Sequence, residues 1–562
     1  MIRTFFKYIV IFFSSVSTYA QNFDVEYTVT HVQSQKEPYL KVNVKLKNIP
    51  STSNTFLYPN RLRGQDHLFN CINNIKVLND DRAKFKVIPE QGLIQLKNSN
   101  TKDIEIEYFV KQDIFKGINL QNRFRPIVHP NYFHVLAQNL FILPDFLTEK
   151  DKIDVKITWE SQNETYAILN SFGVHQKHQE IKNCSLENFQ KALFVGGDYR
   201  IISDKKSVAL AIRDHWKTFD DKSIFSIVTN TNKAQKEFWK EQEEQEQAYA
   251  VVLSPIEGSI KRAYAGTSYF NVFTALMTNT DFVNEDDLMY LVNHELLHKW
   301  IGQKIKNQNE EEQYWFSEGF TEYYTYKIIA KNKINGKGND YFLKKINEAI
   351  KKLWTSKLRE IPNKDITNHT FWKVRGYRDI PYFRGAIFAF MLDLKISEDT
   401  NQKYNLDDVM RNMLSNAINK NQKLKHSYFI QQVNTYLKED ITSLFESYIV
   451  EGNLINLEEL FTNNQLAFKP KMQDFDIGFT YKNQKITEIS TISKAYQAGI
   501  RVNDSIIDAN LFRDTTKVSQ LSIIRNNEEM TIDFYTGSKE INIPQLEINK
   551  TNMDRLQTCI FR

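Results

Sequence analysis

The stretch His294-Glu295-Leu296-Leu297-His298 determines how this chain of 562 residues is interpreted. On a helix with 3.6 residues per turn, the two histidines lie one above the other on one face, and Glu295 projects beside them. This spacing is typical of a helix that supplies two zinc ligands and a general base. A chain with eleven histidines would carry the pattern by chance on the order of once in a hundred such sequences. The alternative is a buried histidine pair without a metal.

The residues before this pentapeptide predict where its helix begins. Asn284 is suited to the N-cap, and the acidic residues 285–287 follow in the first turn, where the helix dipole favours negative charge. Val283 and Leu288 have the spacing of a hydrophobic staple across the cap. Further apolar residues follow at Leu291, Val292, Leu296 and Leu297. We therefore expect a largely buried helix that holds its histidines in place.

A second segment is expected to supply the third ligand, because a hydrolytic zinc site takes three protein ligands and leaves the fourth position to water. The aromatic-rich segment 315–324 indicates another buried helix, and it contains Glu318. A carboxylate among aromatic rings is costly to bury unless a cation neutralises it, as a divalent metal does. We predict that His294, His298 and Glu318 bind one Zn²⁺ per chain, with Glu295 as general base.

Glu322 lies one helical turn after Glu318. Its carboxylate is placed to accept a hydrogen bond from the second ring nitrogen of a ligand histidine, which would fix the tautomer of that histidine. The alternative is a solvent-exposed helix carboxylate with no role at the metal. The sequence leaves both interpretations open.

Together the two segments resemble the gluzincin metallopeptidases, in which His-Glu-x-x-His is followed, after a spacer, by a helix containing Glu-Gly-Phe. The run Phe316-Ser317-Glu318-Gly319-Phe320-Thr321-Glu322-Tyr323-Tyr324 is most similar to the glycyl aminopeptidases, and the leukotriene hydrolase and aminopeptidase group is a related family. The resemblance implies an N-terminal β domain, a thermolysin-like catalytic domain and a C-terminal PDZ domain.

Pro381-Tyr382-Phe383-Arg384-Gly385-Ala386 adds to the resemblance. In the related group, a tyrosine within Pro-Tyr-x-Lys-Gly donates a hydrogen bond to the oxyanion, and the resemblance implies this role for Tyr382. Such a donor suits the chemistry, because negative charge develops on the carbonyl oxygen during hydrolysis. The alternative is a tyrosine that only packs at the start of a helix.

Two features depart from the family pattern. The spacer between His298 and Glu318 holds 19 residues, one more than is common in the related group, and its polar stretch 304–313 suggests that an exposed loop absorbs the difference. The families also carry a Gly-x-x-Glu segment whose carboxylate binds the free amino group of the substrate. Here Gly266 and Ser268 are the candidate substrate-binding residues, with Ser268 near the position of that glutamate. Because a hydroxyl offers no charge-assisted bond to an ammonium, aminopeptidase and endopeptidase action both remain open.

The N-terminus indicates export. Arg3 and Lys7 precede and flank the apolar run 8–13, and small and polar residues end at Ala20, so we expect a signal peptide at 1–20 and a periplasmic or secreted protein. No other segment is long and apolar enough to span a membrane. A net charge of +5, spread over alternating basic and acidic residues, gives no indication of nucleic-acid binding.

The three cysteines, Cys71, Cys184 and Cys559, lack the paired spacing of a metal site. Export permits a disulfide between Cys71 and Cys184. A pair of buried free thiols is the equally open alternative.

The chain is too long for one core, so we expect a multidomain α+β protein. Alternation such as Leu40, Val42, Val44 and Leu46 predicts an antiparallel β domain at 21–204. A thermolysin-like catalytic domain, mixed at first and then helical, is expected at 205–469. A PDZ-like β domain is expected at 470–545, followed by a C-terminal tail at 546–562.

The region 470–545 resembles a PDZ domain through three features. Ile477-Gly478-Phe479 resembles the peptide-binding loop, residues 495–500 resemble a helix that ends at an Ala-Gly turn, and a strand follows at 504–507. The resemblance implies that a C-terminal peptide could bind as an added strand. The alternative is a PDZ fold that only packs against the catalytic domain.

These observations predict an exported zinc metallopeptidase that cleaves peptides or proteins. The competing hypothesis is a catalytically inactive peptide-binding protein on a peptidase scaffold with a PDZ module, although the complete set of ligands and base favours an enzyme. Epoxide opening has a precedent in the leukotriene group, but no residue of this chain favours it over cleavage of an amide bond.

Overall fold

The computed structural model describes residues 23–47, 49, 54–97, 103–114, 117–160, 166–175, 177–204, 207–241, 248–258 and 260–562. The expected signal peptide at 1–20 lies outside these residues. The chain forms two compact units, which are described separately below. One comprises residues up to Asn232 together with Gln242–Glu295, and the other comprises Lys233–Glu241 and Leu296–Arg562. The division falls inside the single helix α4 (Glu285–Leu297).

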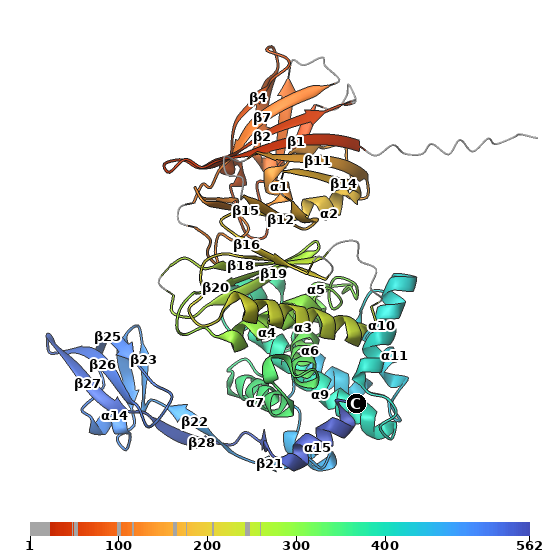
Figure 1. Ribbon diagram of the computed structural model, residues 1–562. Helices are drawn as coiled ribbons and strands as arrows, with labels where there is room; N and C mark the ends of the chain where they lie inside the picture. The colour runs from red at the N-terminus through yellow and green to blue at the C-terminus, as the bar shows by residue number, and fades with distance from the viewer. Residues whose placement is uncertain are drawn as a thin grey trace, which may run out of the picture. The chain divides into compact units, whose positions relative to one another are not determined.

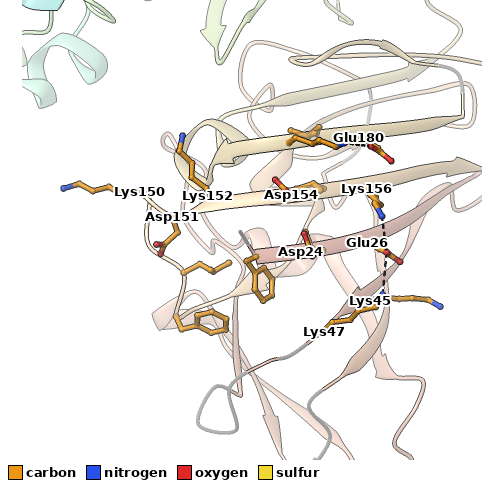
Figure 2. Close-up of a pocket in the computed structure, with 17 residues that line it drawn as sticks. Asp24, Glu26, Lys45, Lys47, Lys150, Asp151, Lys152, Asp154, Lys156 and Glu180 are labelled. Carbon is orange, nitrogen blue, oxygen red and sulfur yellow. Dashed lines mark ion pairs between the residues drawn. The ribbon is translucent and has the colours of Figure 1, made fainter. Parts of the chain in front are cut away.

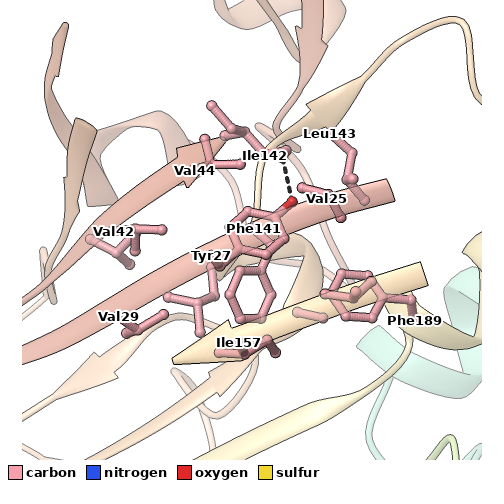
Figure 3. Close-up of a cluster of buried hydrophobic side chains, with 14 of the residues drawn as sticks. Val25, Tyr27, Val29, Val42, Val44, Phe141, Ile142, Leu143, Ile157 and Phe189 are labelled. Carbon is pink, nitrogen blue, oxygen red and sulfur yellow. Dashed lines mark hydrogen bonds between the residues drawn. The ribbon is translucent and has the colours of Figure 1, made fainter. Parts of the chain in front are cut away.

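The first unit begins with a six-stranded sheet in the order β14-β11-β1-β2-β7-β4. Its strands are β1 (Phe23–Val32), β2 (Tyr39–Leu46), β4 (Ile72–Val77), β7 (Ile104–Val110), β11 (Lys152–Glu160) and β14 (His178–Ser185). The predicted alternation is confirmed, because Leu40, Val42, Val44 and Leu46 are all buried. Figure 3 shows part of this core, in which the Tyr27 hydroxyl donates a hydrogen bond to the Ile142 carbonyl at 2.8 Å.

The N-terminal domain is mainly antiparallel as expected, with one parallel pair of strands in this sheet. β1 and β11 run parallel, with Phe23 opposite Ile153 and Thr30 opposite Glu160, while the other pairs of this sheet are antiparallel. An alternating pattern fixes which side chains are buried, but it is the same for both strand directions. The sequence pattern therefore could not reveal this pairing.

Two smaller sheets complete the N-terminal domain. Their orders are β10-β3-β6-β5 and β13-β12-β15-β9-β8. The first contains β3 (Thr55–Leu57), β5 (Lys84–Ile88), β6 (Leu93–Lys97) and β10 (Leu143–Pro144), and the second contains β8 (Ile127–Val128), β9 (Tyr132–Leu136), β12 (Ala167–Asn170), β13 (Gly173–His175) and β15 (Leu193–Gly197). Two short helices, α1 (Ala137–Leu140) and α2 (Leu186–Gln190), connect these strands.

The cysteines are free and buried. Burial raises the pKa of Cys71 to about 12 and that of Cys184 to about 11. The structure therefore favours the alternative of buried thiols over a disulfide between these two residues.

The part of the catalytic region in the first unit is built on a mixed sheet in the order β16-β17-β18-β20-β19. Its strands are β16 (Arg200–Ser203), β17 (Val208–Ile212), β18 (Tyr249–Pro255), β19 (Tyr264–Tyr269) and β20 (Val272–Met277). β16 pairs with β17 and lies before the expected boundary at residue 205. Helix α3 (Asp221–Trp239) connects β17 to β18, and α4 follows β20.

The second unit is mainly helical. Its helices are α5 (Glu310–Ser317), α6 (Gly319–Lys331), α7 (Asn339–Thr355), α8 (Asn368–Lys373), α9 (Asp379–Asp399), α10 (Leu406–Lys420), α11 (His426–Asn434), α12 (Thr442–Phe445) and α13 (Leu457–Asn463). Helix α6 is buried along its length from Gly319 to Ala330. A helical turn at Glu446–Val450 precedes Gly452, which has φ +84°. In the described residues, no helix has both the length and the apolar character that crossing a bilayer requires.

The region predicted to be PDZ-like forms an antiparallel sheet in the order β23-β24-β25-β26-β27 with one short helix, α14 (Lys494–Gln497). The strands are β23 (Phe479–Lys482), β24 (Lys485–Ile489), β25 (Ser505–Asn510), β26 (Val518–Arg525) and β27 (Glu528–Tyr535). A ribbon of β22 (Met472–Asp476) and β28 (Gly537–Ile541) flanks this sheet in the chain (Figure 1).

Residues 546–562, expected only as a tail, belong to the helical region. Strand β29 (Gln545–Leu546) pairs with β21 (Phe468–Lys469), and α15 (Lys550–Cys559) packs against α7 and α9. Asn347 of α7 bonds both the N–H and the carbonyl of Leu546, each at 2.8 Å. The PDZ-like segment is therefore an insertion between β21 and β29. The pairing of these two strands is long-range, and no local sequence pattern indicates it.

Candidate active site

Helix α4 begins as the sequence predicts. The Asn284 side chain accepts hydrogen bonds from the N–H groups of Asp286 and Asp287 at 3.0 and 3.2 Å, and Asp287 bonds back to the Asn284 N–H at 3.2 Å. Val283 and Leu288 are both buried. The capped and stapled helix holds His294, 4% exposed, in its last turn.

The structure brings the three predicted ligands together. One ligand atom from each of His294, His298 and Glu318 lies within 4.8 Å of the others. His298 Nε2 and Glu318 Oε2 are 3.7 Å apart, inside the limit of ~4.2 Å that two zinc bonds of ~2.1 Å allow. Two imidazoles and one carboxylate, partly accessible, form the donor set of a hydrolytic zinc site, so the residues fit this metal.

The tautomer of His298 is set by the main chain. Its Nδ1 lies 3.2 Å from the Ile301 carbonyl oxygen. Because a carbonyl only accepts hydrogen bonds, Nδ1 carries the proton and Nε2 keeps its lone pair for a metal. This carbonyl was not identified from the sequence, since the turn after α4 has no motif that predicts it.

Glu318 lies at the junction of α5 and α6, where a close glycine contact fixes the backbone. A Cβ on Gly319 would lie 2.4 Å from the Gly385 Cα and 2.6 Å from the Pro381 carbonyl oxygen, and a Cβ on Gly385 would lie 1.9 Å from the Trp315 carbonyl oxygen. Helices α6 and α9 therefore approach each other at Gly319 and Gly385 as closely as glycine permits. This contact joins the Glu318 junction to the first turn of α9.

Tyr382 lies in that first turn of α9, between Pro381 and Gly385, and is half-buried. Its ring stacks on Phe371 of α8 with centroids 6.5 Å apart, and Phe371 stacks on Tyr314 of α5 at 4.1 Å. Phe371 thus lies between Tyr382 and Tyr314, which is one helical turn before Glu318. The role of Tyr382 as an oxyanion donor stays a prediction.

Tyr314 was missed in the sequence analysis, although its position one turn before Glu318 could have identified it. Burial raises the pKa of the Tyr314 hydroxyl to about 12, and the charges of Glu310 and Glu318 add to this effect. Tyr314 therefore connects Glu318, whose N–H bonds the Tyr314 carbonyl, to Phe371 of α8.

The general-base candidate, Glu295, lies against strand β19. A Cβ on Gly266 would lie 2.4 Å from the Glu295 Cγ and 2.6 Å from its Oε1. The Ser268 hydroxyl donates a hydrogen bond to the main-chain carbonyl of Glu295 at 3.1 Å. Gly266 thus leaves room for the Glu295 carboxylate, and the Ser268 hydroxyl bonds a main-chain carbonyl near the end of α4. Contact of these two residues with substrate stays a prediction.

Glu322 is buried at 2% exposure, so the alternative of a solvent-exposed carboxylate is wrong. The hydroxyl of Tyr326, one turn later, donates a hydrogen bond to it. Its expected bond to a ligand histidine stays a prediction.

The N-terminal sheet has a surface hollow of about 830 Å³, which Figure 2 shows. Lysines and carboxylates of β1, β2, β11 and β14 alternate around it, and Glu26 lies 3.8 Å from both Lys47 and Lys156. It contains no histidine, cysteine or serine. Its described lining residues therefore lack the imidazoles expected of a hydrolytic zinc site.

Comparison with known proteins gives a partial family match and a similar fold. Residues 268–448 match the model of the peptidase family M1 domain. An aminopeptidase N family protein from Idiomarina loihiensis has a similar structure, with a TM-score of 0.70 and 15% identity, covering 95% of this chain and 100% of that chain. At this identity the likeness shows the fold alone.

Two further matches are weaker. A mutant M1 zinc metallopeptidase from Deinococcus radiodurans, bound to a Tyr-Ser-Ala substrate, has a TM-score of 0.46 and 14% identity, covering 78% of this chain and 95% of that chain. Protein Ycf2 of Physcomitrium patens is 23% identical over 314 residues, which are 53% of this chain and 13% of that protein. The chain thus spans a small part of this curated relative.

Proposed function

We propose that this protein, whose residues 268–448 match the model of the peptidase family M1 domain, is a zinc-dependent metallopeptidase that hydrolyses peptide bonds. The observation that carries the proposal is the meeting of His294, His298 and Glu318 within 4.8 Å, with Glu295 next to His294 on the same helix. When bound, zinc supplies a Lewis acid that makes water a nucleophile at neutral pH.

The side chains of this chain divide the remaining work. Glu295 takes a proton from the attacking water and passes it to the leaving amine. Tyr382 donates a hydrogen bond to the carbonyl oxygen as negative charge develops there. Glu322 holds the orientation of a ligand histidine, because a buried carboxylate beside the site is suited to accept a ring N–H.

The choice between aminopeptidase and endopeptidase action depends on how a free amino terminus would bind. Ser268 offers a neutral hydroxyl, and the carbonyl of Glu295 already accepts its hydrogen bond. We propose that the enzyme does not require a free amino terminus. Peptides with free and acetylated amino termini test this directly, because a strict aminopeptidase cleaves only the free form.

Export to the periplasm or outside the cell is also part of the proposal, supported by the signal-like residues 1–20. Mass spectrometry of the mature N-terminus tests it, and cleavage after Ala20 is the expected result. A mature protein that keeps Met1–Ala20 would contradict this step.

For the PDZ-like region, C-terminal peptide binding is the weaker of the two hypotheses. The Gly478 N–H, which a terminal carboxylate would need, donates to the Asp476 carboxylate at 2.9 Å. A Cβ on Gly478 would also lie 2.5 Å from the Ser493 Cβ, so the loop is packed against the chain. We propose that the PDZ-like region only packs against the catalytic domain and does not bind C-terminal peptides. Tighter binding of free-carboxyl peptides than of amidated ones by the full chain would contradict it.

Hydrolysis itself is tested with the purified chain and a library of peptides. A zinc chelator should abolish cleavage. Glu295→Gln should retain zinc but lose activity by a factor of about 10² or more, the range for general acid–base catalysis. If the wild-type chain binds zinc but cleaves no peptide, the inactive peptide-binding scaffold becomes the better explanation.

A further inference from the structure

The end of α8 and its connection to α9 combine exposed aromatic and basic residues. This stretch contains Trp372, Lys373, Arg375 and Arg378, which we name the basic aromatic segment. Trp372 is 57% exposed, and the three cations are also exposed. Single exposed apolar side chains and exposed cations are each ordinary, so only the position of this segment can set it apart.

The cations of this segment lack acidic partners. Within residues 260–562, all of which are described, no carboxylate lies within ion-pair distance of Lys373, Arg375 or Arg378. Residues 364–379 contain four cations against two carboxylates, Asp365 and Asp379. The nearby Glu311 carboxylate accepts the Asn368 N–H at 2.9 Å. Residues 364–379 therefore carry two more cations than carboxylates, with Glu311 of α5 beside them.

The position of the segment distinguishes it from an ordinary solvated surface. Phe371, the neighbour of Trp372, stacks on Tyr314 with ring centroids 4.1 Å apart, and Tyr314 lies one helical turn before Glu318. The same Phe371 ring stacks on Tyr382 at 6.5 Å and contacts the Trp372 ring edge-on at 5.0 Å. Phe371 thus connects this segment to the expected metal ligand and to the expected oxyanion donor.

We propose that the basic aromatic segment binds carboxylate groups of the peptide substrate, so that the enzyme prefers anionic peptides. This inference rests on the proposed peptidase function and names its substrate class. Trp372 offers a flat apolar surface for a substrate side chain or backbone, and the cations offer charge-assisted hydrogen bonds to a carboxylate. Since arginine binds carboxylates in bidentate geometry, Arg375 and Arg378 contribute more than Lys373.

The size of the effect is limited by solvent. Exposed ion pairs are individually weak and are screened by salt, so three cations should favour an anionic peptide by about tenfold in kcat/KM at low ionic strength. This preference should fall several-fold at about 1 M salt, where the Debye length is roughly 3 Å.

The experiment compares peptides of one length that contain neutral residues, glutamates or lysines, each with a free and an amidated C-terminus. The test variant is Lys373→Gln/Arg375→Gln/Arg378→Gln. The matched control is Lys420→Gln/Lys423→Gln/Lys438→Gln, which removes three exposed cations elsewhere in the same unit. The test variant should lose about tenfold in kcat/KM on glutamate peptides and little on neutral ones, whereas the control should match the wild type.

The outcomes separate the two proposals. A loss that follows glutamate content assigns the interaction to acidic side chains, and a loss that follows the free C-terminus assigns it to the terminal carboxylate. Equal wild-type rates on neutral and anionic peptides, or equal losses in test and control variants, overturn this inference and leave the peptidase intact. If no peptide is cleaved, the peptidase proposal fails instead. Fluorescence anisotropy of the labelled peptides then decides the anionic preference by binding.

Discussion

Strand β2 and helix α6 bury side chains in opposite ways. In β2, buried Leu40, Val42 and Leu46 alternate with more accessible polar residues, so its core contains almost no charge. In α6, every residue from Gly319 to Ala330 is buried, including Glu322 and Lys327. The strand is stabilised by removing apolar surface from water, while the helix needs a partner for each buried polar group.

The partners in α6 come from both local and distant residues. Thr321 and Thr325 donate to carbonyls one turn earlier, at 2.7 and 2.8 Å. Lys327 donates to the Asp393 carboxylate at 2.7 Å and also to Asp407. Buried charge of this kind adds little net stability but is costly to disrupt. Helix α6, whose buried polar groups all need partners, therefore holds the junction at Glu318 in place, and the regular sheet does not.

Lys327→Met should produce the largest effect, because it leaves Asp393 and Asp407 buried without their cation. We expect a loss of about 3–5 kcal/mol in the free energy of unfolding, measured by urea denaturation. The matched change in the sheet is Lys41→Met, whose cation lies 3.2 Å from Glu107 and is partly exposed. It should cost less than about 1 kcal/mol. Similar losses in both variants would refute the contrast.

Acid should destabilise the N-terminal domain through two histidines. Burial lowers the pKa of His31 and of His134 from 6.5 to about 4. Because the unfolded chain binds these protons more readily, their contribution is present above pH ~6.5 and is lost as the pH falls toward ~4. The loss is on the order of 3 kcal/mol for each histidine. Urea denaturation between pH 7 and 4.5 measures it, and His134→Phe should flatten the slope. A slope unchanged in this variant would contradict the assignment.

Features that depend on neighbouring residues could be predicted from the sequence. Local patterns were sufficient for the Asn284 cap and for the alternation in β2, since each depends on residues within one or two turns. The sequence also named the three groups that meet, His294, His298 and Glu318, because their residue types suit one metal. Their role as zinc ligands stays a prediction.

Features that depend on distant residues escaped prediction. The contact of Gly385 with the Trp315 carbonyl joins two residues that are 70 positions apart in the chain. The parallel pairing of β1 with β11 and the return of β29 to β21 are of the same kind. Period and propensity describe one element at a time, so they cannot show which elements meet.

Gly266→Ala should sharpen the comparison at the catalytic side chain. The new methyl group would displace the flexible Glu295 side chain while leaving the backbone of β19 in place, so activity should fall by about 10² with zinc retained. Peptide hydrolysis and elemental analysis of the same sample measure both quantities. Wild-type turnover would show that Gly266 does not control the position of Glu295.

Ser268→Ala should give the smallest effect. It removes one hydrogen bond to the Glu295 carbonyl, which contributes about 1 kcal/mol, and should lower activity by no more than about tenfold. The free energy of unfolding and kcat/KM on free and acetylated peptides are the measurements. A loss confined to peptides with free amino termini would instead assign Ser268 to substrate binding.

The most direct test of the account is the zinc content of the purified chain. The wild type and Glu295→Gln should each contain one zinc ion per chain by elemental analysis, and Glu318→Gln should lose most of it while remaining folded by circular dichroism. A folded Glu318→Gln variant that retains a full zinc ion would contradict the assignment of His294, His298 and Glu318 as the metal centre.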